Sequence, residues 1–273
     1  MNPTSIRIAF STCPNDTFMF AAWINNLIDT ENLNIQVTLA DIKELNQMAR
    51  LGQIDVCKVS FFAYAFLRHR YNLLDAGSAL GKGCGPLLVS YKQLTINELP
   101  FSTIAIPGLD TTANLLLQSY CQHVAHKRVM LFSEIIPALN RREVDAGVII
   151  HESRFVYQQH GLHAIVDLGE FWEKQTGLPI PLGGIVASRK FSPEMIQKIN
   201  RVLRRSIEFA IENPDTVMPY VRQYAQEMDD VVTKAHIELY VNKSTLSLGH
   251  EGQQAVKQLI EIADSLAVLS GAI

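Results

Sequence analysis

Short apolar runs of strand type alternate with longer helical patterns over residues 6–150 of this 273-residue chain. The helical patterns begin near Asp16, Asp41 and Thr112 and cover the segment SEIIPALNRR. Strands that alternate with helices indicate βαβ units, so we expect an α/β fold built on mainly parallel sheets. The expected strands are IRIAF, IQVTL, VCKVSFF, LLVS, TIAIP, VML and AGVII.

A strand, a polar turn and an apolar helix follow one another twice along the chain. Residues Arg7–Phe20 and Thr103–Leu116 share this order, and Arg50–Ser60 and Asn140–His151 both run from a helix end into a strand. Because each pattern recurs once, we favour two lobes of common architecture over coincidence. Parallel sheets bind ligands at the carboxyl ends of their strands, and helix N-termini there suit a carboxylate or phosphate. A cleft for a small anion is therefore expected between the lobes.

Two segments are suited to connect the lobes. The polar stretch Ser90–Pro100 reads as a crossover, and Leu178–Ser188, with its prolines and glycines, reads as the return and hinge. These segments predict a larger, discontinuous lobe of residues 1–92 and 183–273 and a smaller lobe of residues 93–182.

The chain becomes helical after Ser192, which is expected to cap a helix with Pro193 at its first position. Helical patterns also cover DDVVTKAHIELYV and EGQQAVKQLIEIADSLAVL. Apolar and charged residues alternate there as on surface helices, so we expect this helical C-terminal segment to serve packing more than chemistry.

Composition limits the classes of partner. Apolar residues make up 48% and charged residues 19%, as in globular proteins, and a net charge of -3 offers no field for nucleic acid. No apolar stretch approaches the roughly 20 residues that span a bilayer, and the N-terminus lacks a signal-peptide core. We therefore expect a cytoplasmic protein with a small-molecule partner and no membrane partner. The four cysteines are scattered without a CxxC pair, so thiols are expected and a zinc site is not.

His151 is the sharpest candidate for chemistry because it follows the apolar run Val148–Ile150 at a strand end expected to face the cleft. An imidazole with an ordinary pKa of about 6.5 is suited to moving protons near neutrality. A buried histidine bonded to a carbonyl or to Glu152 fits the pattern equally well. Glu152 and Arg154 are expected to support the loop, by pairing with each other or by fixing it.

Further polar residues occur where the cleft is expected. Lys58 and Ser60 lie on an apolar strand, and a buried lysine is costly unless a ligand or carboxylate meets it, so a cleft position is favoured for both. Thr111 and Thr112 stand at a helix start, where they could hold an anion or cap the helix. In the first repeat Asn15 is expected to be an N-cap and Asp16 to lie near the helix start, and capping alone would explain both.

Other motifs point away from cofactors. The glycine-rich stretch LGKGCGPLLVS fits neither the dinucleotide fingerprint nor the P-loop, so no nucleotide cofactor is expected. Cys84 within it has no evident activating base and is a weak candidate nucleophile. The pair in HVAH (His123–His126) has no third ligand nearby and is read as solvated surface.

Several spaced motifs together resemble the 1,4-dihydroxy-6-naphthoate synthase family of menaquinone biosynthesis over nearly the whole chain from Ile6. The motifs are STCPNDTFMF, KVSFFAYAFLRHRY, ALGKGCGPLLVS, PGLDTTA, GVIIHESRF and DLGEFWEKQTGLPIPLGGI. The resemblance implies the two-lobed fold of type 2 periplasmic binding proteins. It also implies a lyase that converts cyclic dehypoxanthinyl futalosine to the naphthoate with release of dihydroxyacetone, without cofactor or metal. One departure is Thr12, where the family commonly has proline.

Carried over by motif, His151 is the implied proton acceptor. Lys58, Val59 and Ser60 of the KVS strand, and Thr111 and Thr112, are the implied substrate contacts.

Two alternatives stay open. Chorismate dehydratase shares the fold and pathway but is not known for the IIHESRF motif, and a solute-binding protein would capture an anion without converting it. The oligomeric state is also open, a homodimer included.

Overall fold

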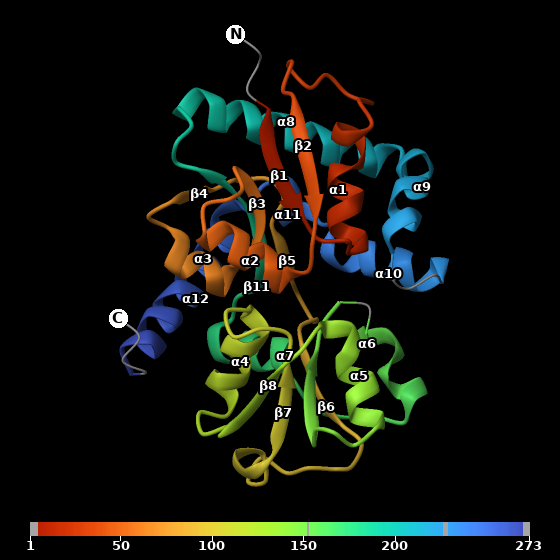
Figure 1. The fold of residues 1–273 in the computed structure, drawn as a ribbon, viewed down its shortest axis with the longest axis vertical. Coiled ribbons are helices and arrows are strands. Elements are labelled where there is room, and N and C mark those ends of the chain that lie inside the picture. The colour runs from red at the N-terminus through yellow and green to blue at the C-terminus, as the bar shows by residue number, and fades with distance from the viewer. Residues whose placement is uncertain (1–4, 152, 226–228, 270–273) are drawn as a thin grey trace.

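The computed structural model describes residues 5–151, 153–225 and 229–269, arranged as two α/β lobes with one above the other in Figure 1. The strands are β1 (Ile6–Phe10), β2 (Ile35–Leu39), β3 (Val56–Ser60), β4 (Tyr71–Leu73), β5 (Ala79–Gly81), β6 (Leu87–Ser90), β7 (Thr103–Ile106), β8 (His126–Val129), β9 (Ala146–Ile149), β10 (His163–Asp167) and β11 (Ile180–Ser188). The α-helices are α1 (Pro14–Ile24), α2 (Ile42–Arg50), α3 (Phe61–Leu67), α4 (Thr112–Tyr120), α5 (Phe132–Asn140), α6 (Ser153–Val156), α7 (Leu168–Thr176), α8 (Pro193–Glu212), α9 (Pro214–Tyr224), α10 (Asp230–Tyr240), α11 (Lys243–Leu246) and α12 (Gly249–Leu269). Two 3-10 turns, η1 (Leu99–Phe101) and η2 (Tyr157–His160), lie in the lower lobe.

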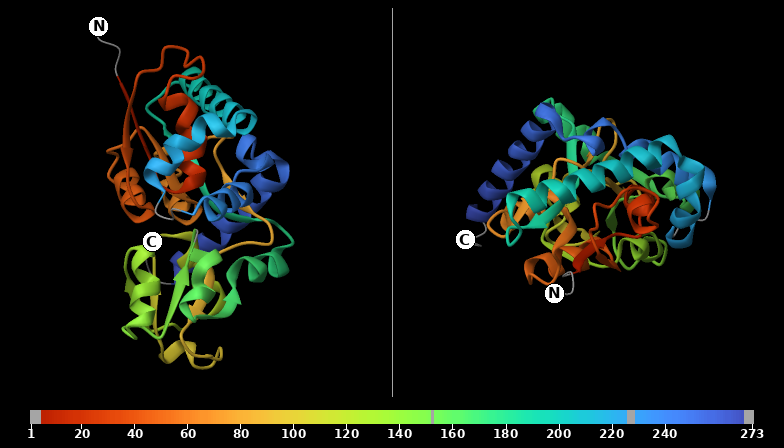
Figure 2. Two further views of the ribbon diagram at one scale, coloured as in Figure 1. Left: turned by 90° about the vertical axis from the view of Figure 1, so that its right-hand side faces the viewer. Right: turned by 90° about the horizontal axis from the view of Figure 1, so that it is seen from above.

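The sheet of the upper lobe has the strand order β2-β1-β3-β11-β4, with β5 paired to β11. β1 runs parallel to β2 and β3, whereas β11 runs antiparallel to β3, β4 and β5. Phe10 stacks on Phe20, which in turn lies against Trp23, and all three are buried where α1 covers the sheet. Figure 2 shows α8 crossing this lobe, with α9 beyond one end of it.

The sheet of the lower lobe has the order β10-β6-β9-β7-β8. β7 is parallel to β8 and β9, but β6 is antiparallel to both β9 and β10. The expectation of mainly parallel sheets is therefore wrong. The antiparallel pairs all involve β6 or β11, the strands by which the chain enters a sheet after leaving the other. Such strands do not close a βαβ crossover, so nothing forces them to run parallel to their neighbours.

We propose that the lobes correspond to these two sheets. The first crossing then lies between Gly81 and Leu87, earlier than the expected boundary at residue 92, and the return lies just before Ile180. An apolar cluster that includes Phe62, Leu116 and Leu259 draws on both lobes, so they pack against each other beside the crossings.

Helix caps explain where the elements next to the cleft begin. Ser192 caps α8, as the sequence predicts, and Thr111 caps α4, which is one of the two roles considered for it. The prediction that Asn15 caps α1 is wrong, because Pro14 occupies the first helical position and Cys13 becomes the N-cap. Asn15 thus lies inside the first turn. Among the described helices, none combines the length and apolar character needed to cross a membrane.

Candidate active site

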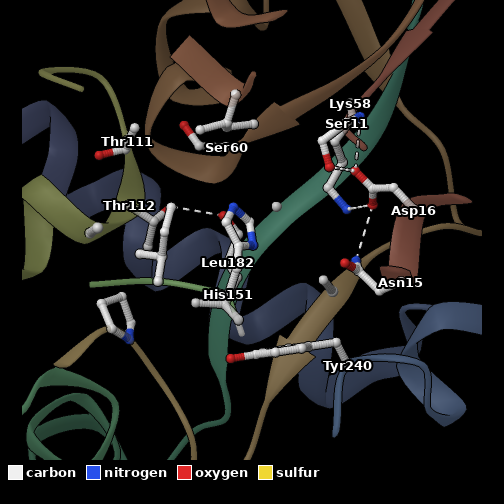
Figure 3. Close-up of a pocket in the computed structure, with 16 residues that line it drawn as sticks. Ser11, Asn15, Asp16, Lys58, Ser60, Thr111, Thr112, His151, Leu182 and Tyr240 are labelled. Atoms are coloured by element: carbon white, nitrogen blue, oxygen red, sulfur yellow. Dashed lines mark hydrogen bonds and ion pairs between the residues drawn. The ribbon is translucent and has the colours of Figure 1, made fainter. Parts of the chain in front are cut away.

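A pocket lies between the lobes, beyond the carboxyl ends of β3, β7 and β9 (Figure 3). The structure brings five of the expected residues to its wall: Lys58, Ser60, Thr111, Thr112 and His151. Apolar surface from Ile42, Ile150 and Leu182 lies among them. The pocket therefore offers a largely apolar volume with polar groups at separate points, as small-molecule sites do.

His151 has a left-handed backbone, with φ of 57° two residues beyond the end of β9. This conformation costs a residue with a Cβ about 1–2 kcal/mol and persists only where the surroundings enforce it. The imidazole lies edge-on to the ring of Phe132, with centroids 4.8 Å apart, and 6.1 Å from the ring of His236. The strained turn thus places the imidazole in the pocket between the two lobes (Figure 3).

Burial lowers the pKa of His151 from 6.5 to about 4, because the charged imidazolium is poorly solvated in the pocket. The negative charge of Asp16 opposes this shift and the positive charge of Lys58 adds to it. No hydrogen bond joins the imidazole to any residue that the structure describes. At neutral pH the side chain is therefore a neutral base.

Asp16 organises the polar groups on the far side of His151. Its Oδ1 accepts from Lys58 Nζ at 2.8 Å and from Asn15 Nδ2 at 3.1 Å. Its Oδ2 accepts from Ser11 Oγ at 2.7 Å and from the Ser11 amide at 3.3 Å. The side chains of Lys58 and Asp16 are only 7% and 2% exposed, so the ion pair is held away from bulk water. We call Ser11, Asn15, Asp16 and Lys58 the Asp16 cluster.

His236, from α10, extends this cluster into the C-terminal region. Its Nε2 lies 3.0 Å from Asn15 Oδ1, and the ring is fully buried. Because Asn15 donates its amide to Asp16, its carbonyl oxygen faces the imidazole, and Nε2 is the donor of this hydrogen bond. Burial keeps the pKa of His236 well below its ordinary value, so this ring is also neutral.

The three hydroxyls near α4 are bonded within the protein. Ser60 Oγ donates to the Asp110 carbonyl at 2.6 Å, and Thr112 Oγ1 donates to the Leu182 carbonyl at 3.0 Å, so each joins one lobe to the other. Thr111 Oγ1 donates to the Gly108 carbonyl at 2.8 Å and caps α4 through Asn114. Of the two roles considered for Thr111 and Thr112, capping is therefore present at Thr111, and anion binding stays a prediction.

Two backbone donors at the start of α4 are not used within the described part of the protein. The amides of Thr112 and Ala113 have no acceptor among the described residues, and both residues line the pocket. The first N–H groups of a helix carry partial positive charge and bind anions.

Val59 does not present its side chain to the pocket. The side chain is fully buried in the core beneath α2 and α3, so any contact with a ligand would be made by its backbone. The backbone lies beside Gly183 of β11, where a Cβ would come within 2.9 Å of Val59 O and 3.0 Å of Lys58 Cε. Glycine at position 183 therefore lets the Lys58 side chain pass into the pocket.

Arg154 fixes the loop beyond His151, although with a partner other than Glu152. Its guanidinium donates to the Gly85 carbonyl and lies 3.1 Å from Asp167 Oδ2. Asp167 in turn caps α7 through its other oxygen. The pairing with Glu152 considered from the sequence lies outside the described residues.

The weaker candidates remain outside the chemistry. Burial raises the pKa of the Cys84 thiol to about 11, which disfavours the thiolate a nucleophile needs. His123 and His126 are exposed at the edge of the lower lobe. Among the described residues no group of three or more metal-binding side chains comes together.

Two site residues come from the helical segment expected to serve packing. Tyr240 lines the pocket, and His236 lies behind the Asp16 cluster; both belong to α10. Their burial within an amphipathic helix gives the sequence no signal of function. The hydrogen bond of 3.0 Å between His236 and Asn15, which are 221 positions apart, becomes visible only in the folded structure.

Comparisons with known proteins agree with the geometry. A family model described as menaquinone biosynthesis matches residues 6–265. Two curated proteins named 1,4-dihydroxy-6-naphtoate synthase are each 41% identical to this chain. The one from Thermus thermophilus covers 96% of this chain and 94% of its own length, and the one from Streptomyces coelicolor covers 95% and 93%.

Solved structures show the same fold. A protein of Archaeoglobus fulgidus superposes with a TM-score of 0.92 at 36% identity, covering 98% of this chain and 100% of its own. The alkanesulfonate-binding protein from Xanthomonas axonopodis, bound to MOPS, superposes with a TM-score of 0.70 at 14% identity and covers 100% and 94%. The expected periplasmic-binding-protein-like fold is therefore confirmed.

Proposed function

We propose that this chain, which belongs to the menaquinone biosynthesis family, is a 1,4-dihydroxy-6-naphthoate synthase acting on cyclic dehypoxanthinyl futalosine. The names of both curated relatives support this assignment. The observation that carries the catalytic part is the neutral imidazole of His151, held by a strained turn in a pocket between two lobes.

In the proposed reaction His151 accepts the proton of the hydroxyl on the carbon that joins the two fragments. The oxygen becomes a carbonyl, and the carbon–carbon bond to the three-carbon fragment breaks in a retro-aldol manner. The fragment that keeps the benzoate ring becomes aromatic as 1,4-dihydroxy-6-naphthoate, and the other leaves as dihydroxyacetone. The enzyme is thus a carbon–carbon lyase. The two products together contain all the atoms of the substrate, so the reaction consumes no oxidant, reductant or water and calls for no cofactor or metal.

The start of α4 is the proposed site for the substrate carboxylate. The amides of Thr112 and Ala113 supply unpaired donors, and the helix dipole favours an anion there. Ser60 and Thr111 border this end of the pocket, and the Val59 backbone is proposed as a further contact. Lys58 contacts the substrate from the opposite side. The proposal retains the cytoplasmic location that the sequence predicts.

The proposal is tested by incubating the purified chain with cyclic dehypoxanthinyl futalosine and, separately, with chorismate. We expect the absorbing naphthoate to form from the first and chorismate to be unchanged. Consumption of chorismate alone would identify the dehydratase instead, and tight binding without any product would identify a binding protein.

His151→Asn is the informative variant for the base. Asparagine adopts left-handed backbone more readily than most residues, so the turn is preserved while the proton acceptor is lost. Turnover near that of the wild type in a folded His151→Asn protein would contradict the assignment of His151 as the base.

A further inference from the structure

The pocket has two polar ends with different electrical character. In Figure 3, Ser60, Thr111 and Thr112 lie on one side of His151 and the Asp16 cluster lies on the other. The first end offers unpaired helix donors, and its nearby carboxylate, Asp110, is paired with Arg50. The second end contains a buried ion pair that is neutral as a whole. A substrate with a carboxylate at one end and a carbonyl at the other would be oriented by this difference.

We propose that the Asp16 cluster receives the carbonyl-bearing end of the substrate, with Lys58 Nζ donating to the carbonyl oxygen and Asp16 as the residue that positions Lys58. This assignment rests on the proposed function and adds a second group to the chemistry of His151.

Asp16 acts here as an acceptor and not as a second base. Its two oxygens receive four hydrogen bonds, from the Lys58 ammonium, the Asn15 amide and the Ser11 hydroxyl and backbone amide. Both of its oxygens are therefore occupied by donors of the protein itself. We therefore assign to Asp16 the role of holding these donors in place.

Lys58 has donors left for a ligand. An ammonium group carries three N–H donors, and within the described residues one of them meets an acceptor, Asp16 Oδ1. The side chain is 7% exposed and lines the pocket, so water from bulk solvent cannot fully satisfy the others. A buried ammonium with unused donors at a pocket wall is suited to bind an oxygen of the ligand.

A neutral oxygen fits this position better than a carboxylate does. Asp16 Oδ1 lies 2.8 Å from Lys58 Nζ, so a second carboxylate bound to the same ammonium would lie close to the first and be repelled. A ketone oxygen is uncharged in the ground state and gains negative charge only as the bond breaks. Lys58 then binds the transition state more strongly than the substrate, which is the condition for catalysis.

The proposed step conserves protons and electrons. One proton passes from the substrate hydroxyl to His151, and the oxygen forms a carbonyl on the naphthoate fragment as the carbon–carbon bond breaks. The electron pair of that bond passes to the leaving three-carbon fragment as an enolate. The charge rests on the oxygen that Lys58 binds. Return of a proton to the enolate releases neutral dihydroxyacetone and restores neutral His151.

The test compares wild type, Lys58→Ala and Lys58→Ala supplied with methylammonium. We expect Lys58→Ala to lower kcat by about 100-fold or more, the effect of removing one donor to a developing oxyanion, with KM changed only a few-fold. Methylammonium should restore part of kcat, whereas tetramethylammonium, which has no N–H donor, should restore none. Near-normal kcat in Lys58→Ala, or a loss confined to KM, would overturn the proposal.

The positioning role of Asp16 needs its own variant. Asp16→Asn should lower kcat in the wild-type background and abolish methylammonium rescue in the Lys58→Ala background, because the added cation loses its anchor. Undiminished rescue in the double variant would show that Asp16 does not position the ammonium. If Lys58→Ala does not fold, the neutral pair Lys58→Met with Asp16→Asn replaces it, and wild-type turnover in that folded protein would equally overturn the proposal.

Failure of the two ideas can be told apart. If the wild-type protein makes no naphthoate, the proposed function is wrong. If the wild type is active and the Lys58 variants keep its kcat, the proposed function stands and the proposed role of Lys58 is wrong.

Discussion

His236 Nε2 and Asn15 Oδ1 are 3.0 Å apart, and this hydrogen bond joins helix α10 to the first turn of α1. Asn15 donates a hydrogen bond to Asp16, and Asp16 accepts another from Lys58. The polar side of the pocket is therefore assembled from three distant parts of the sequence.

Replacing His236 by alanine should leave the buried Asn15 oxygen without this donor. A buried polar group that loses its partner destabilises a protein by about 1–3 kcal/mol, and the cavity left by the ring adds to that. Urea unfolding measures the change. His236→Gln is the matched control, because its amide N–H can reach the place of Nε2; equal losses in both variants would show that the hydrogen bond is not what matters.

The sequence predicts His151 and the threonines near the pocket because each stands at the end or start of a recognisable element. It predicts Lys58 and Ser60 there because they lie on an apolar strand, where a lysine is costly to bury without a partner. Local patterns say which residues lie at strand and helix ends, and parallel topology brings those ends together. The sequence predicts only part of the Asp16 cluster in this way. Capping explained Asn15 and Asp16 well enough on its own, and nothing local relates either of them to His236, since that contact depends on how α10 packs.

The direction of strands β6 and β11 is a second feature that the sequence does not predict. The apolar run of β6 predicts a strand but not its direction, because direction depends on how the chain enters the sheet after crossing from the other lobe. The same holds for β11, which brings Leu182 and Gly183 to the pocket.

The depressed pKa of His151 predicts activity at mildly acid pH. An ordinary histidine would be mostly protonated at pH 5.5 and inactive as a base, whereas His151, with a pKa of about 4, stays neutral there. We expect NMR titration of the His151 ring, identified by its absence in His151→Asn, to show a midpoint near 4. A midpoint near 6.5 would show that the pocket does not exclude water as the structure indicates.

The same shift predicts how stability depends on pH. Between pH 6.5 and 4 the unfolded chain binds a proton at position 151 while the folded protein does not, so the free energy of unfolding falls as the pH falls. His236, whose pKa is also lowered by burial, acts in the same direction. Above pH 6.5 neither contributes, because both states are neutral. Each proton steepens the slope by about 1.4 kcal/mol per pH unit.

His151→Asn isolates one part of this dependence. The variant removes the titrating group but retains a residue that tolerates the turn, so its free energy of unfolding should fall less steeply between pH 6.5 and 4 than that of the wild type. Denaturant titrations at several pH values check this. Parallel curves for the two proteins would contradict the shifted pKa.

Gly183 should be needed for full turnover because it borders the stem of Lys58. A Cβ at this position would lie 2.9 Å from Val59 O and 3.0 Å from Lys58 Cε, and the first of these atoms is backbone in the middle of a β-ladder. Since the main chain cannot yield easily, the lysine stem or β11 must shift, and Lys58 Nζ moves with it. We expect Gly183→Ala to lower kcat by about 10-fold or more, because a displacement of about 1 Å in an active site has effects of this order.

Gly184→Ala, one residue along the same strand, is the matched control, because its Cβ would meet the side chains of Leu73 and Phe61 and not Lys58. That variant should lose stability with kcat largely kept, and an equal fall of kcat in both variants would show that strain in β11, and not the path of Lys58, limits the reaction.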